Sequence, residues 1–147
     1  MPETLVFCYG LELNLSLLHC TVGGPRPLVF GAATAIGLRR YWDASGHLPN
    51  ARPTAGATLT GALVHLLPEQ LQRLESNRLV PVLYQWRKAA VLLPTGRRRQ
   101  AQLLWCPRGQ PPGRASFSAW QEVVVGALEH ALPDRAVEEL LALRPND

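Results

Sequence analysis

Two spacings of apolar residues alternate along the chain, one typical of strands and the other typical of helices. Stretches rich in β-branched and aromatic residues that end near Gly or Pro predict strands. We expect these strands at residues 4–10, 28–42, 58–66, 84–93 and 99–106. Within the second stretch, Gly31 and Gly37 interrupt the pattern and predict bulges or bends.

Helical spacing marks the segments between and after these strands. We expect helices at residues 11–20, 68–75, 116–131 and 135–143. Pro68 suits the first turn of the second helix, and either Ser116 or Ser118 is placed to cap the third. Residues 43–56 contain two Gly and two Pro, and residues 108–114 are rich in both, so we predict loops there.

The order of these elements predicts an α+β fold. Its sheet is expected to be mixed or antiparallel and barrel-like, flanked by helices and followed by a helical C-terminus, because no βαβ repeat is present. The length of 147 residues fits one domain, covering residues 1–147. We find no apolar run near the roughly 18 residues of a membrane span and no secretory leader. Cys8, Cys20 and Cys106 lack metal-ligand spacing and are expected as free thiols in the cytoplasm.

The net charge of +4 has its main local source in three consecutive arginines at residues 97–99. Such a run can bind nucleic acid, but this one falls at the tip of a predicted hairpin, and no aromatic residues are interleaved with it. We therefore expect a small-molecule substrate as the partner, with neither nucleic acid nor a membrane. No histidine pair has zinc spacing, so we predict no metal, and we expect no cofactor. The sequence leaves the oligomeric state open, a homodimer included.

The strand at residues 4–10 ends at Tyr9-Gly10, and a helix is predicted directly after it. A turn of this kind leaves backbone N–H groups unpaired and pointing in one direction. It can therefore hold a carboxylate or carbonyl oxygen, which makes it the candidate binding loop of the chain.

Four blocks of sequence follow one another in a fixed order. The first block is Phe-Cys-Tyr-Gly-Leu-Glu-Leu at residues 7–13, and the second is the strand expected before a helix at residues 59–66. The third is Leu-Gln-Arg-Leu-Glu at residues 71–75, which precedes Tyr84, and the fourth is the stretch of residues 126–147. Together these blocks resemble the gamma-glutamylcyclotransferase family, whose loop has the pattern aromatic-x-Tyr-Gly-Ser-Asn-Leu and whose helix carries Leu-Asp-x-x-Glu. The resemblance spans nearly the whole chain and implies that family's fold.

The resemblance also implies an intramolecular aminolysis of a small γ-glutamyl compound. The α-amine of the γ-glutamyl group attacks its own γ-carbonyl, which releases an amine or peptide together with 5-oxoproline. A base must take a proton from the ammonium, and donors must hold the carbonyl oxygen as charge develops on it. By this resemblance, the substrate is expected to contact Tyr9, Gly10, Leu11, Leu13, Tyr84 and Trp120.

This chain departs from the family's pattern at the positions that carry the chemistry. In the loop, Leu11 and Glu12 stand where the family has Ser and Asn. Counted from Leu74, the family's acid–base Glu falls at Arg78, whose guanidinium stays protonated and cannot act as a base. Counted back from the C-terminal block, the family's Tyr falls at Ala119.

Two interpretations of these changes stay open. In the first, a remodelled enzyme uses Glu12 as its base and Arg78 to bind an anionic group or an oxyanion. Glu75, one helical turn before Arg78, is a further candidate base if the helix is shifted. In the second, Glu12 and Arg78 form a salt bridge across an emptied pocket, and the protein is an inactive small-molecule binder or a partner subunit. Cys8 lacks an evident His partner, and we expect a buried core thiol there rather than a nucleophile.

Overall fold

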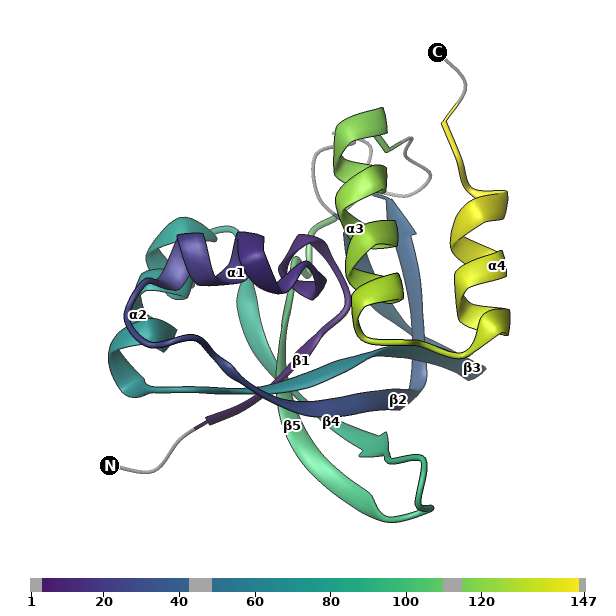
Figure 1. Ribbon diagram of the computed structural model, residues 1–147, viewed down its shortest axis with the longest axis horizontal. Helices are drawn as coiled ribbons and strands as arrows, with labels where there is room; N and C mark the ends of the chain where they lie inside the picture. Colours follow the sequence, from purple (N-terminus) through teal and green to yellow (C-terminus); the bar gives the residue numbers. More distant parts are fainter. Residues whose placement is uncertain (1–3, 43–48, 110–114, 146–147) are drawn as a thin grey trace.

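A closed barrel of five strands forms the centre of the computed structural model, which describes residues 4–42, 49–109 and 115–145 (Figure 1). The strands are β1 (Thr4–Cys8), β2 (Leu28–Trp42), β3 (Pro49–Leu66), β4 (Gln85–Leu92) and β5 (Arg98–Trp105). Their order around the barrel is β1-β3-β2-β4-β5. All pairs are antiparallel except β1 with β5, which closes the barrel in parallel at Val6 and Gln102. This arrangement confirms the predicted α+β fold with a mixed, barrel-like sheet.

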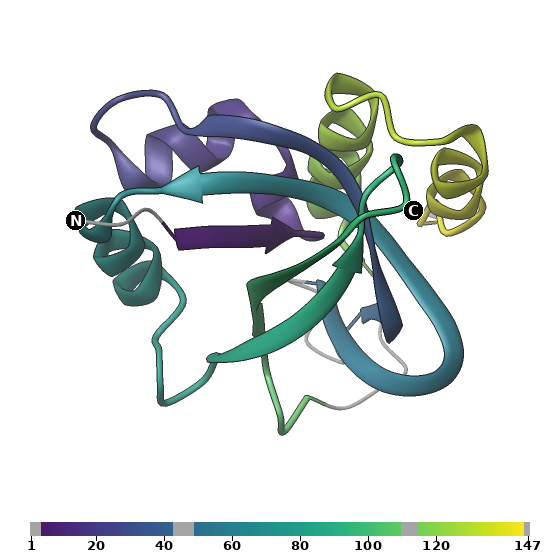
Figure 2. The same ribbon diagram turned by 90° about the horizontal axis from the view of Figure 1, so that it is seen from below.

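Helices cover one side of this barrel. They are the short 3₁₀ helix η1 (Leu11–Leu13), α1 (Leu15–Val22), α2 (Pro68–Asn77), α3 (Phe117–Glu129) and α4 (Asp134–Ala142). In Figure 1, α1 and α3 lie above the sheet while the β4–β5 hairpin projects below it, and Figure 2 shows α3 and α4 side by side. In the described part of the chain, no helix combines the length and the apolar character that crossing a membrane requires.

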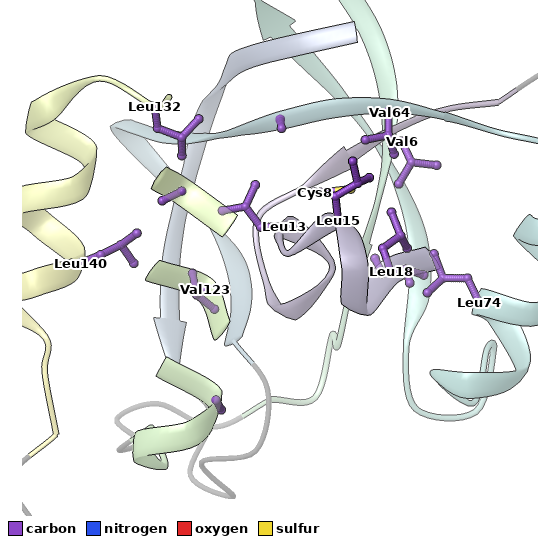
Figure 3. Close-up of a cluster of buried hydrophobic side chains, with 14 of the residues drawn as sticks. Val6, Cys8, Leu13, Leu15, Leu18, Val64, Leu74, Val123, Leu132 and Leu140 are labelled. Atoms are coloured by element: carbon purple, nitrogen blue, oxygen red, sulfur yellow. The ribbon is translucent and has the colours of Figure 1, made fainter. Parts of the chain in front are cut away.

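Strand β1 contributes to two hydrophobic cores because its side chains alternate between opposite faces. Phe7 and the following Tyr9 belong to the cluster inside the barrel, together with small residues such as Ala33 and Ala35 of β2. Val6 and Cys8 belong to the cluster between the barrel and the helices, where Figure 3 shows them with leucines of η1, α1 and α2. A strand buried on both faces reads as a continuous apolar run, which is the pattern of residues 5–9.

The predicted bends in β2 are confirmed. The register of β2 against β3 shifts between Val29 and Gly31 and again between Ile36 and Leu38. Gly31 and Gly37 take φ values of 137° and 78°, which a residue with a side chain adopts only at a cost. These two bulges bend the long β2–β3 ribbon.

Two expectations about elements are wrong. Residues 49–56 are not a loop but the first part of β3, and residues 49–53 pair with the end of β2. Proline is tolerated there because Pro49 is the first residue of the strand and Pro53 lies opposite the second bulge. The helix expected at residues 11–20 is interrupted at Asn14, whose extended backbone separates η1 from α1. Of the loops expected at residues 43–56 and 108–114, residues 43–48 and 110–114 lie outside the described residues.

Candidate active site at the end of the first strand

The turn after β1 is fixed by its own hydrogen bonds. The Tyr9 hydroxyl is buried and donates to the carbonyl of Leu104 on β5. The N–H of Leu13 donates to the carbonyl of Gly10 at 3.0 Å, and the N–H of Asn14 donates to the carbonyl of Leu11 at 3.1 Å. The first N–H groups of a helix have no acceptor within it, so those at the start of η1 need an acceptor from outside the helix.

Helix α3 holds the turn from the other side. Asn14 caps α1 by accepting from the N–H of Leu17, and its amide nitrogen donates to Glu122 of α3 at 2.6 Å. Gly126 of α3 lies so close that a Cβ there would fall 2.4 to 2.6 Å from backbone atoms of Leu13 and Asn14. The turn is therefore clamped between the barrel and α3 and is pre-organised before any ligand arrives.

Glu12 and Arg78 meet directly over this turn. Arg78 follows α2 as its C-cap residue, and its Nη2 donates to Oε2 of Glu12 at 3.2 Å. The Arg78 side chain is only 13% exposed and the Glu12 side chain only 11%. A Cβ on Gly10 would lie 3.2 and 3.4 Å from the two carboxylate oxygens of Glu12, so this carboxylate lies against the backbone of the turn.

A small pocket surrounds the ion pair. Its lining residues come from five separate parts of the chain: Tyr9, Glu12, Pro49, Arg78, Tyr84 and Leu104. The free volume is only about 10 Å³, which is room for about one water molecule. The ion pair thus occupies most of the space between these lining residues. A larger, open groove of about 640 Å³ between α1 and α2 is lined by other residues and lies apart from the turn.

The buried groups around the pocket are electrostatically coupled. Burial raises the pKa of Tyr9, and the nearby Glu12 and Tyr84 raise it further. Burial also raises the pKa of Cys8, so its thiol stays protonated, and Cys8 lies in the core as expected. Glu12 raises the Cys8 pKa further, and Arg78 lowers it.

The other predicted site residues lie beside the pocket rather than in its wall. Glu75, one turn before Arg78 on α2, accepts a hydrogen bond from Trp86 Nε1 at 3.0 Å. Leu11 packs against the core, and Leu13 is completely buried in it. Trp120 is buried in α3, and its indole nitrogen donates to the carbonyl of Leu140 at 2.7 Å, which ties α3 to α4. The role of each in catalysis or binding stays a prediction.

Two polar residues at the site are not found by sequence reasoning. Arg40 of β2 donates to the carbonyl of Tyr9 through both Nε and Nη2, at 3.1 and 2.9 Å. Asn50 of β3 is fully buried and bonds to both backbone groups of Cys106 and to the Tyr41 hydroxyl. Arg40 follows Arg39 and resembles an ordinary exposed cation, and Asn50 falls in the segment expected as a loop. Within the described ranges, no three side chains of His, Cys, Asp or Glu lie close enough together to hold a metal ion.

Comparison with known proteins supports a common fold. A structure of a gamma-glutamyl cyclotransferase is 20% identical with a TM-score of 0.87, over 99% of this chain and 90% of that chain. An uncharacterized protein from Homo sapiens is also 20% identical with a TM-score of 0.87, over 100% of this chain and 91% of that one. The glutathione-specific enzyme from yeast is 11% identical with a TM-score of 0.60, over 97% of both chains. No curated protein sequence matches this chain.

A match to a family model establishes the family that the four sequence blocks predict. The model described as gamma-glutamyl cyclotransferase, AIG2-like, matches residues 6–122, from β1 into α3. This range includes the Tyr9-Gly10 turn, Glu12 and Arg78. The chain therefore belongs to the gamma-glutamyl cyclotransferase, AIG2-like family.

Proposed function

We propose that this protein is a cyclotransferase-type enzyme that cyclises a small γ-glutamyl or related amine-bearing compound. The observation that carries the proposal is the position of the Glu12 carboxylate, which lies against Gly10 and is held there by Arg78. A carboxylate and a guanidinium side by side match the two charges of an amino-acid head group. Glu12 would bind the α-ammonium and Arg78 the α-carboxylate of the ligand, so that one ion pair is exchanged for two.

Glu12 is also the base in this proposal. It takes a proton from the α-ammonium, and the freed amine attacks the γ-carbonyl carbon within the same molecule. The new C–N bond closes the five-membered ring while the carbonyl oxygen becomes an oxyanion. The bond to the departing amine then breaks as Glu12 gives its proton to that nitrogen. The ring nitrogen still carries a second proton from the original ammonium, and this proton passes to the departing amine, so the products are 5-oxoproline and the amine in its ammonium form.

The N–H groups at the start of η1, which have no acceptor within that helix, support the oxyanion step. The oxyanion would lie near the N–H groups of Gly10 and Leu11, which form the beginning of this clamped helix. Donors that are already in place stabilise developing charge without a cost of reorganisation. Because the free volume is about 10 Å³, a ligand enters only when the Arg78 side chain swings away from Glu12.

The test is to incubate the purified protein with a panel of γ-glutamyl amines and peptides and to measure 5-oxoproline. We expect turnover of at least one compound and a loss of about 10²- to 10⁴-fold in Glu12→Gln, since that is the usual contribution of a general base. Glu69→Gln is the matched control, because Glu69 is an exposed carboxylate on α2. Selective loss in Glu75→Gln, with Glu12→Gln active, would instead assign the base to Glu75.

The second candidate function is a non-catalytic binder, and the filled pocket favours it. A buried ion pair that blocks its own cavity is the geometry expected of a site that no longer turns over substrate. Calorimetry with amino acids and γ-glutamyl compounds separates the two functions. A ligand that is bound and recovered unchanged supports the binder, whereas a ligand that is consumed excludes it.

A further inference from the structure

Arg40 is a cation in an unusual place for a strand residue. Its guanidinium reaches from β2 past β3 to the end of β1, where it donates twice to the Tyr9 carbonyl and once, at 3.3 Å, to the carbonyl of Thr60. Burial lowers the pKa of Arg40 to about 10, while Tyr9 and Glu12 raise it. The side chain therefore remains charged near neutral pH. Among the described residues, no carboxylate lies within ion-pair distance of it.

The two stronger bonds both end on one oxygen. The Tyr9 carbonyl belongs to the same peptide group as the N–H of Gly10, and in a trans peptide these two groups point in opposite directions. A guanidinium that binds the oxygen draws electron density from the peptide and makes its N–H a stronger donor. It also fixes the plane of the peptide, because Nε and Nη2 approach the oxygen together.

We propose that Arg40 is a positioning residue that orients and polarises the Tyr9–Gly10 peptide, so that the Gly10 N–H binds the oxyanion of the substrate. This inference rests on the proposed function. Arg40 lies on the far side of the peptide from the ligand and touches no reacting atom. Its positive charge reaches the oxyanion through the peptide dipole, which explains why a half-buried cation is placed at a turn whose other charges form their own pair.

A purely structural role is the alternative. In that case, Arg40 only satisfies two carbonyl groups at the end of the barrel, and its loss reduces stability without changing the chemistry of the folded protein. Three variants separate these roles. Arg40→Met removes the charge and the donors, Arg40→Lys restores a charge with a single donor, and Arg39→Met is the matched control on the neighbouring, exposed position.

Steady-state kinetics on folded protein are the first measurement. We expect kcat to fall about 10- to 100-fold in Arg40→Met with KM changed less than about threefold, which is smaller than the loss of about 10²- to 10³-fold when an oxyanion donor is itself removed. Arg40→Lys should lie between Arg40→Met and the wild type, and Arg39→Met should match the wild type. A lower melting temperature in Arg40→Met with an unchanged kcat would overturn the inference.

Nuclear magnetic resonance of the unliganded protein gives a second measurement that needs no turnover. We expect the ¹³C carbonyl signal of Tyr9 and the ¹⁵N signal of Gly10 to shift in Arg40→Met and to stay in place in Arg39→Met. If these shifts occur but the wild type cyclises no γ-glutamyl compound, the proposed function fails while the polarised peptide stands. If the Gly10 signal does not move, the inference fails whatever the activity.

Discussion

Glu12 and Arg78 lie 66 positions apart in the sequence, yet their side chains occupy the same small space over the turn. Each is only about a tenth exposed, so each carries a charge that water solvates poorly. A charge in this position depends on its partner, because removing one member leaves the other buried and unpaired. The pair therefore has a stability consequence that can be measured separately from any activity.

A double-mutant cycle measures that consequence. We expect Arg78→Ala to lower the free energy of unfolding by about 1–3 kcal/mol, because it leaves the Glu12 carboxylate without its donor. Adding Glu12→Gln should recover much of that loss, giving a coupling energy of about 1–3 kcal/mol in urea unfolding. Arg135→Ala serves as the control, since its ion pair with Glu139 is largely exposed and should contribute about 0.3–0.5 kcal/mol at most. Additive effects of the two site substitutions would contradict the coupling.

The sequence predicts that Glu12 and Arg78 meet, but it does not predict the roles of Arg40 and Asn50 beside them. The resemblance to the family's loop and helix motifs implies that Glu12 and Arg78 lie at one pocket, because both positions are found by counting along those local motifs. Arg40 and Asn50 depend instead on how the bulged β2–β3 ribbon folds over the barrel end. That geometry is set by long-range pairing, which no local pattern encodes.

At the scale of elements, the site depends on the contact between η1 and α3. Most strands and helices follow from periodicity and capping: Ser116 caps α3, as one of the two predicted candidates. The first part of β3 cannot be predicted in this way, because its two prolines and its glycine are typical of loops, and only pairing with β2 makes the segment a strand. The interruption at Asn14 likewise comes from packing, since its side chain caps α1 and binds Glu122.

Gly126→Ala tests the contact between η1 and α3. Helix propensity alone favours Ala over Gly by about 1 kcal/mol. The added Cβ would lie 2.4 to 2.6 Å from backbone atoms of Leu13 and Asn14, which cannot move aside as a flexible side chain would. Because overpacking of this kind costs about 1–3 kcal/mol or more, we expect net destabilisation and reduced ligand affinity.

Urea unfolding measures this effect. Leu128→Ala, at a position that is 61% exposed on the same helix, should change the free energy of unfolding by no more than about 0.5 kcal/mol. A Gly126→Ala protein that is more stable than the wild type would show that α3 does not hold the turn.

For the whole molecule, the two cores make the stability sensitive to alkaline pH. Cys8 is the last residue of β1 and Tyr9 follows it, and their side chains enter the outer and inner core respectively. Burial raises the pKa of each above its value in the unfolded chain. Their contribution to stability is therefore complete below the unfolded pKa values and is lost as the pH rises beyond them.

We expect the free energy of unfolding to fall above pH about 8.5, where the unfolded Cys8 ionises, and more steeply above pH about 10, where Tyr9 follows. Each group adds a slope of up to about 1.4 kcal/mol per pH unit. Urea unfolding between pH 7 and 10.5 should show a shallower decline in Cys8→Ala. Cys20→Ala is the control, because Cys20 is exposed, and its curve should follow the wild type. Parallel curves for Cys8→Ala and the wild type would contradict the prediction.

The parallel pairing of Val6 with Gln102 has a consequence for biosynthesis. The turn at Tyr9-Gly10 is synthesised well before β5 and α3, which hold it. At about 5–20 residues per second, several seconds pass between the synthesis of the turn and that of these two elements. A chain released after residue 116 would carry Glu12, Arg40 and Arg78 and still lack the helix that clamps the turn. The site is thus complete only after α3 has been synthesised.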